Sequence, residues 1–130
     1  MKKIYKFLIG FGIVILLVII GSIVAFKSME KGLSDLLTVP IEEIDLSAVE
    51  DGSYTGSFTR MPISVKVQVT VENHDITAIE IIEHVSGQGQ PAEVIIDEIV
   101  VKDSVIIDAV AGATYSSKCI LLAVKNAVNP

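Results

Sequence analysis

The stretch ISVKVQVTVE, residues 63–72, alternates apolar and polar side chains without interruption. Such alternation is typical of a half-buried antiparallel strand, because successive side chains of a strand point to opposite faces of its sheet. The residues NHD at 73–75 supply turn chemistry, and residues 76–84 form a second apolar segment in which Ile79 and Ile81 share a face. The pattern therefore predicts a β-hairpin at the centre of the fold.

The segments on either side of the hairpin predict an α+β domain, in which helices cover one face of a small antiparallel sheet. Residues 54–59 have the composition of a third strand, and Gly56 would permit a bulge in it. Residues 105–110 are predicted to form a further strand, and the apolar spacing from residue 116 onward predicts a final helix.

A shorter helix is predicted to begin near Pro91, because proline suits a first helical turn. Glu98 and Lys102 are spaced for an ion pair on the outer face of this helix. Four of its apolar side chains are expected to face the sheet: Val94, Ile95, Ile99 and Val100.

The N-terminal run from Phe7 to Phe26 holds twenty positions without a charged residue. This length and composition predict one transmembrane helix, and the three lysines ahead of it, Lys2, Lys3 and Lys6, favour a cytoplasmic N-terminus. A cleaved signal peptide is the alternative, but the run is longer than a usual signal core, so an uncleaved anchor is preferred. Both interpretations place the rest of the chain outside the cytoplasm.

These features divide the chain into three expected parts: a cytoplasmic N-terminus and membrane anchor (residues 1–27), a tether (28–50) and a folded domain (51–130). From Lys27 onward, 7 basic residues stand against 16 acidic ones, a net charge of −9 that disfavours nucleic acid as a partner. The single cysteine, Cys119, excludes an intrachain disulfide and is expected to pack inside the last helix. No metal-ligand cluster, P-loop or nucleophile motif is present, so neither a catalytic residue nor a metal site is predicted.

The stretch DAVAGATYSS, residues 108–117, joins the expected strand to the last helix through small and hydroxyl-bearing residues. The first amides of a helix lack internal partners and carry partial positive charge, so they favour a phosphate, and Gly112 and Ala113 leave room for one. The alternative is structural: Thr114, Ser116 or Ser117 caps the helix, and Gly112 is an ordinary turn residue.

Five residues of this stretch, Asp108, Ala111, Gly112, Ala113 and Thr114, resemble the flavin-attachment signature of the FMN-binding domain family. That family includes subunits of ion-pumping quinone and ferredoxin oxidoreductases. Its signature ends on a Thr or Ser whose hydroxyl is esterified to the phosphate of FMN, and Thr114 stands at that position. Ala111 departs from the signature, since the family usually has Ser or Thr there, and this leaves non-covalent binding of FMN open.

Two further segments resemble the same family, so that the resemblance runs from Asp51 to the C-terminus. The segment DGSYTG, residues 51–56, matches the family's usual opening, and residues 87–89 correspond to its glycine-containing loop near the flavin ring. His84 is expected beside that loop, where it could tune the charge of the flavin, but an exposed histidine without a role is the preferred interpretation. The resemblance implies FMN as the cofactor and nine candidate binding residues: Thr114 as the covalent attachment point, with Gly112, Ala113, Asp108, Ser116, Ser117, Gly87, Gln88 and Gly89.

The anchor and the signature together predict a membrane-anchored, extracytoplasmic flavoprotein that carries electrons. The resemblance implies a separate flavin transferase that attaches the cofactor, with Asp108 serving that transferase, and redox partner proteins or a quinone-linked oxidoreductase in the membrane. Two alternatives remain open: a non-covalent FMN-binding or sensing module, and a structural accessory of a membrane redox complex in which the corner is only a capped turn.

Overall fold

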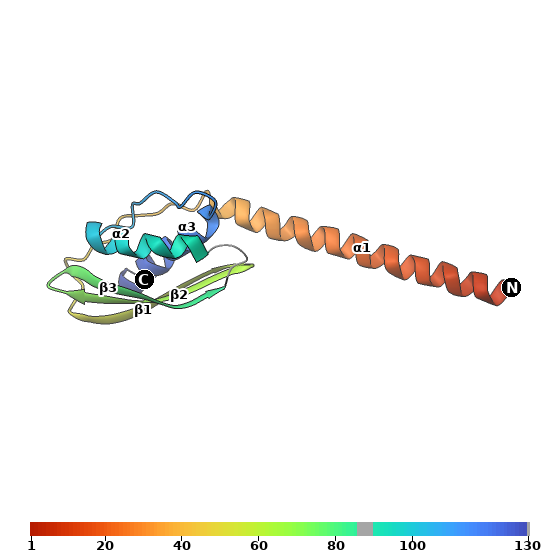
Figure 1. Ribbon diagram of the computed structural model, residues 1–130, viewed down its shortest axis with the longest axis horizontal. Coiled ribbons are helices and arrows are strands. Elements are labelled where there is room, and N and C mark those ends of the chain that lie inside the picture. Colours follow the sequence, from red (N-terminus) through yellow and green to blue (C-terminus); the bar gives the residue numbers. More distant parts are fainter. Residues whose placement is uncertain (86–89, 130) are drawn as a thin grey trace. The chain divides into compact units, whose positions relative to one another are not determined.

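The computed structural model describes residues 1–85 and 90–129 (Figure 1). The chain divides into two compact units, Met1–Gly32 and Leu33–Pro130. The first unit is helical and belongs to helix α1 (Lys2–Leu36), and the second contains the sheet and the remaining helices.

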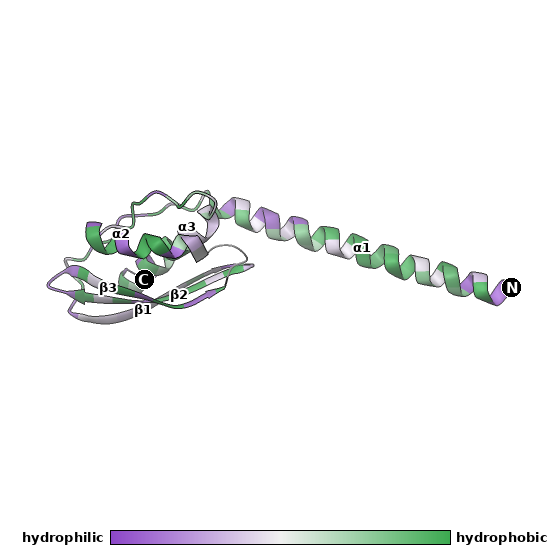
Figure 2. Cartoon of the chain, viewed as in Figure 1, coloured by the Kyte–Doolittle hydropathy of each residue, from purple (hydrophilic) through white to green (hydrophobic). Residues whose placement is uncertain are grey.

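Helix α1 is apolar over most of its length (Figure 2). Its residues from Ile4 to Phe26 are exposed. At a rise of about 1.5 Å per residue, its 35 residues exceed the roughly 30 Å hydrocarbon thickness of a bilayer. The helix is therefore long and apolar enough to cross a membrane, as the sequence predicts.

Three antiparallel strands form one sheet in the order β1-β2-β3, and their bounds are Gly52–Arg60, Ile63–Glu72 and Asp75–Val85. The alternating stretch is β2, and four of its valines, at positions 65, 67, 69 and 71, are fully buried on the inner face. Asn73 and His74 have φ angles of 52° and 65°, as a two-residue type I′ hairpin turn requires. The predicted hairpin and the third strand are confirmed.

Strand β3 is irregular at two places where its register against β2 shifts. Val67 pairs with Ile81 but Lys66 pairs with Glu83, so Ile82 is an extra residue in β3, and it is 50% exposed. A bulge of this kind reverses the alternation beyond it. As a result His84, which pairs with the buried Val65, turns toward the inside of the domain.

The 3-10 helix η1 (Gln90–Val94), helix α2 (Ile95–Lys102) and helix α3 (Thr114–Val128) lie on one face of the sheet (Figure 1). Ile95 and Ile99 of α2 are buried, and the nitrogen of Lys102 lies 2.7 Å from a carboxylate oxygen of Glu98, as predicted. The expectation that Val94 faces the sheet is wrong, because Val94 ends the 3-10 turn and is 64% exposed.

The strand expected over residues 105–110 is not present, and the chain there is an irregular connection between α2 and α3. Val105 is fully buried, whereas Ile106 is 55% exposed. A run of three β-branched residues is compatible with a strand but does not require one. An irregular connection that buries only one of the three side chains, as this one buries Val105, can have the same composition.

At Gly56 of β1 the backbone of α3 lies close to the sheet. A Cβ atom added to Gly56 would overlap the carbonyl oxygen of Ala123 and the amide nitrogen of Ala127, and would lie 2.7 Å from Ala127 Cα. The pairing of β1 with β2 continues through Gly56 without a shift, so β1 has no bulge at the position where the sequence would permit one. The glycine is instead required because the helix backbone packs directly on the strand.

The segment between α1 and β1 packs on the domain, with Ile44 and Val49 in the core beside Leu36 of the last turn of α1. The backbone N–H of Asp45 donates to Asn129 Oδ1 at 2.6 Å, and Asn129 Nδ2 donates to the Asp45 carbonyl at 3.0 Å. From Leu33 onward, the residues expected as a tether therefore belong to the compact C-terminal unit.

Candidate functional site

The residues before α3 form a tight turn that closes with a hydrogen bond from the Ala113 N–H to the Val110 carbonyl, 2.9 Å. Gly112 stands at its third position with φ at +79°, which a type II turn requires and glycine adopts readily. Apart from Gly112 and its two chain neighbours, no atom of residues 1–85 and 90–129 lies within 4 Å of the place where a Gly112 side chain would begin, so the turn presents open backbone to the described part of the domain.

The hydroxyl of Ser117, which is fully buried, holds this turn against α3. It accepts a hydrogen bond from the Val110 N–H at 2.9 Å and donates one to the Ala113 carbonyl at 2.7 Å. The Ser117 hydroxyl is therefore engaged with the backbone of the turn. In this arrangement it stabilises the turn beside the expected FMN site.

The first turn of α3 begins after Ala113, the N-cap residue, which makes no side-chain cap hydrogen bond. This turn contains no acidic residue, although the chain as a whole carries a net charge of −6. Helix-start amides without a side-chain cap, at the positive end of the helix dipole and without a carboxylate beside them, suit a phosphate group. Thr114, the first residue of this turn, is exposed.

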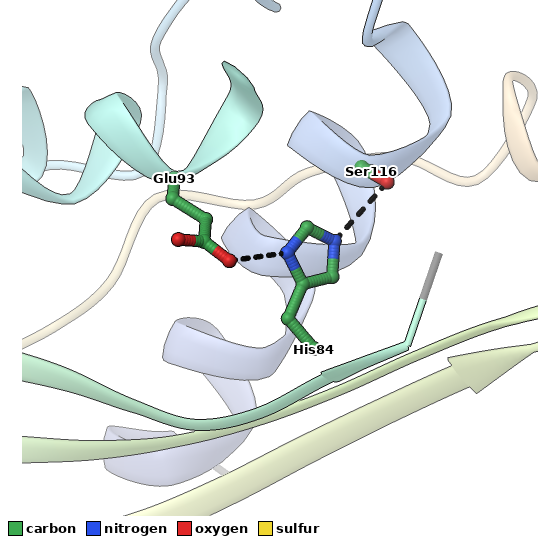
Figure 3. Close-up of polar contacts among 3 residues, drawn as sticks. All are labelled: His84, Glu93 and Ser116. Carbon is green, nitrogen blue, oxygen red and sulfur yellow. Dashed lines mark hydrogen bonds and ion pairs between the residues drawn. The ribbon is translucent and has the colours of Figure 1, made fainter. Parts of the chain in front are cut away.

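Behind the first turn of α3, three side chains form a hydrogen-bonded chain from three different elements (Figure 3). His84 Nδ1 of β3 lies 2.9 Å from Glu93 Oε1 of η1, and His84 Nε2 lies 3.2 Å from Ser116 Oγ of α3. The His84 side chain is 2% exposed and Ser116 is 3% exposed, while the Glu93 side chain is 43% exposed.

The chemistry of the partners fixes the direction of one of these bonds. A carboxylate only accepts, so Nδ1 of His84 carries a proton and donates to Glu93. In the neutral imidazole Nε2 then accepts from the Ser116 hydroxyl, and in the charged imidazole it donates to Ser116 Oγ. Both ring nitrogens are satisfied in either state.

The expectation that His84 is exposed is wrong, because the bulge at Ile82 turns this histidine inward. Simple alternation along β3 from Ile79 and Ile81 puts Glu83 inside and His84 outside, and no feature of the sequence marks the extra residue.

The candidate residues from the signature lie together where α3 begins: Gly112 and Ala113 form the turn, Thr114 starts the helix, and Ser116 and Ser117 point behind it. Asp108 is exposed on the connection before the turn, and its charge, after the larger effect of Glu98, contributes to raising the pKa of Lys102. Gly87, Gln88 and Gly89 lie outside the described residues.

Arg60 at the end of β1 is a residue that sequence reasoning missed. Its guanidinium lies 5.7 Å from the centre of the Phe58 ring, and its Nε is buried without a hydrogen-bond partner among residues 1–85 and 90–129. Burial raises the pKa of the Cys119 thiol on α3 to about 11, and the positive charge of Arg60 partly opposes this rise.

A groove of about 290 Å³ lies beside the C-terminal half of α3, where Leu122 and Asn126 are among its lining residues. These residues are more than two helical turns beyond Thr114. The groove is therefore separate from the phosphate-suited start of the helix.

The fold and the site define a class: a small α+β domain whose last helix starts with uncapped amides that suit a phosphate group, on a chain with an apolar N-terminal helix. The sequence profile of the FMN-binding domain family matches residues 62–129, more than half of the chain. The chain belongs to the FMN-binding domain family, and FMN is its cofactor. The match to the family begins at residue 62, after the DGSYTG segment at residues 51–56. A search of curated proteins found no match to the chain.

Proposed function

We propose that this protein is a membrane-anchored, extracytoplasmic electron carrier that holds FMN in a covalent bond to Thr114. The observation that carries the proposal is the start of α3, where an exposed threonine hydroxyl stands at a helix N-terminus without a side-chain cap and without an acidic residue in its first turn. FMN, when bound, supplies an isoalloxazine ring that accepts and returns electrons.

In the proposed covalent complex, the residues around the start of α3 have different roles. Thr114 provides the oxygen that is esterified, and the amides of the first turn of α3 stabilise the charge that remains on the phosphodiester. Gly112 keeps the approach to Thr114 open, and Ser117 fixes the turn behind it.

Covalent attachment suits a protein whose domain lies outside the cytoplasm, where a dissociated cofactor is lost by diffusion. The lysines before the apolar part of α1 favour a cytoplasmic N-terminus, so the domain would follow on the outer side. Anchoring raises the effective concentration of the domain near redox partners in the same membrane.

A flavin transferase that uses FAD is the partner that this chemistry requires. The Thr114 oxygen would bond to the phosphate on the FMN side of FAD, the bond between the two phosphates of FAD would break, and AMP and the hydroxyl proton would leave. Asp108 is exposed six residues before Thr114 and makes no side-chain hydrogen bond within the described part of the chain. We assign it to recognition by the transferase.

The electron-carrier role is tested with the full chain co-produced with a flavin transferase and purified in detergent. We expect the flavin absorbance to bleach on addition of a reductant and to return on addition of an acceptor, over repeated cycles. A Thr114→Ala chain, purified identically, should show neither change. A bound flavin that cannot be reduced and reoxidised contradicts the role.

Ala111 favours a second candidate, non-covalent FMN binding, because the family usually has a hydroxyl residue at this exposed position. Fluorescence of the protein band in a denaturing gel separates the two candidates. A fluorescent band supports the covalent bond, whereas flavin that copurifies with the native chain but leaves it on denaturation supports the second candidate.

A further inference from the structure

The hydrogen-bonded chain of Glu93, His84 and Ser116 takes no part in the proposed attachment of FMN as described so far, although Ser116 is one of the candidate binding residues of the signature. We propose that His84 is a positioning residue: through Ser116 it holds the first turn of α3, and with it the Thr114 hydroxyl, in the orientation that flavin attachment needs. The inference rests on the proposed function, and it concerns the residues behind Thr114 rather than those that touch FMN.

The burial of His84 is the first argument. An imidazole that is 2% exposed carries two polar nitrogens into the interior, and burying them without partners costs free energy. Its neighbours on the inner face of β3, Ile79 and Ile81, are aliphatic, and an aliphatic residue would serve packing equally well. A bulge at Ile82 is nevertheless required to bring the histidine inside.

The position of Ser116 is the second argument. Ser116 lies two residues after Thr114 in the same helical turn, so a fixed Ser116 holds the backbone from which the Thr114 side chain projects. The N-cap residue contributes no side-chain bond to this turn. Two serine side chains hold the first turn of α3 in addition to its backbone bonds: Ser117 binds it to the turn before α3, and Ser116 binds it to β3 through His84.

The position of Glu93 is the third argument. Glu93 belongs to η1, and its carboxylate accepts from His84 Nδ1, so the imidazole is held from the side opposite Ser116. A ring held at both nitrogens has one orientation, and this makes His84 a rigid link between β3, η1 and α3.

The test compares rates of flavin attachment by a purified transferase to full chains carrying His84→Leu, His84→Gln or Ser116→Ala. Rates are measured below the temperature at which circular dichroism shows each chain to unfold. We expect His84→Leu and Ser116→Ala to lower kcat by about tenfold or more, with little change in KM for the chain, because the acceptor hydroxyl is misplaced while the docking surface is intact.

Two chains serve as controls. His84→Gln should recover part of the rate, because an amide group can still bond to Ser116. His74→Gln should match the wild type, since His74 also bonds through Nδ1, to the Leu46 carbonyl at 2.9 Å, but lies in the hairpin turn between β2 and β3.

A second test measures amide hydrogen exchange in full chains without flavin, so its result does not depend on the transferase. The Ser117 amide, which is bonded to the Ala113 carbonyl at 2.9 Å, should exchange about tenfold or more faster in Ser116→Ala, while amides of β1 are unchanged. Wild-type attachment rates and wild-type exchange in both His84→Leu and Ser116→Ala overturn the inference. A wild-type chain that takes no flavin overturns the proposed function instead.

Discussion

Three hydroxyl residues at the start of α3 differ in what their side chains contact. Ser117 binds the backbone of the preceding turn, Ser116 binds His84, and Thr114 is exposed. Only an exposed hydroxyl is accessible to a transferase, so burial singles out the residue at the acceptor position of the family signature.

Gly56 allows a test of packing at the residue scale. Replacing Gly56 with Ala should lower the free energy of unfolding by about 3 kcal/mol, because the new methyl group overlaps backbone atoms of Ala123 and Ala127 that cannot move independently of α3. Urea denaturation of the full chain in detergent measures the change. Ser57→Ala, at the exposed neighbouring position, is the control, and an equal effect of both substitutions would contradict this packing.

Cys119 reports on the folded state of the same helix. Burial raises the pKa of this thiol from 9.0 to about 11, so at pH 8 the folded chain holds about 100-fold less thiolate than an unshifted thiol. Reaction with a disulfide reagent should therefore be slow in the native chain and fast in denaturant. Rapid reaction of the native chain would show that the face of α3 that carries Cys119 is not packed against the domain.

The sequence predicts the environment of some of these residues and not of others. The place of Cys119 in the apolar spacing of the last helix predicts its burial, and this is confirmed. The close approach of α3 to Gly56 and the inward turn of His84 depend on contacts between segments far apart in the chain. Gly56 would permit a bulge but is paired without one, and no feature of the sequence marks the bulge at Ile82.

At the scale of elements, the turn between residues 110 and 113 and the start of α3 behave as one unit. Ser117→Ala should lower the free energy of unfolding by about 1–3 kcal/mol, because the Val110 N–H and the Ala113 carbonyl both lose their bond to this hydroxyl inside the domain. Thermal unfolding measures the loss, and the exposed Ser53→Ala is the control. An unchanged midpoint would show that the turn holds without Ser117.

Most elements are predictable from the sequence because their periods are clear. Alternation predicts β2 and β3, and helical spacing predicts α2 and α3. Residues 105–110 carry too short a pattern to distinguish a strand from a connection, and in the structure Val105 packs into the core without pairing. The position of Thr114 at a helix start is predicted, whereas the partners of Ser116 and Ser117 are not.

At the scale of the whole molecule, the stability of shortened chains can show where the folded domain begins. Leu36, Ile44 and Val49 are buried in the domain core, and each buried side chain of this size contributes about 1.5–3 kcal/mol. Their sum is comparable with the total stability of a small domain, about 5–15 kcal/mol. Residues before β1 are therefore expected to support the fold as well as to connect it to α1.

Shortened chains test this expectation. A chain that begins at Leu33 should unfold cooperatively, whereas a chain that begins at Asp51 should unfold at a much lower temperature or fail to fold. Circular dichroism during heating distinguishes them. Equal unfolding midpoints would show that the sheet and helices after Asp51 suffice and that residues 33–50 act as a tether.

The most direct measurement is the mass of the peptide that contains Thr114, from the full chain co-produced with a flavin transferase and exported. We predict an added mass equal to FMN less one water on this peptide, with fragmentation placing it on Thr114. The added mass should be absent from Thr114→Ala and retained in Thr114→Ser, which keeps the hydroxyl. An unmodified peptide from a wild-type chain that binds FMN in its native state, or FMN on another residue, would contradict covalent attachment at Thr114.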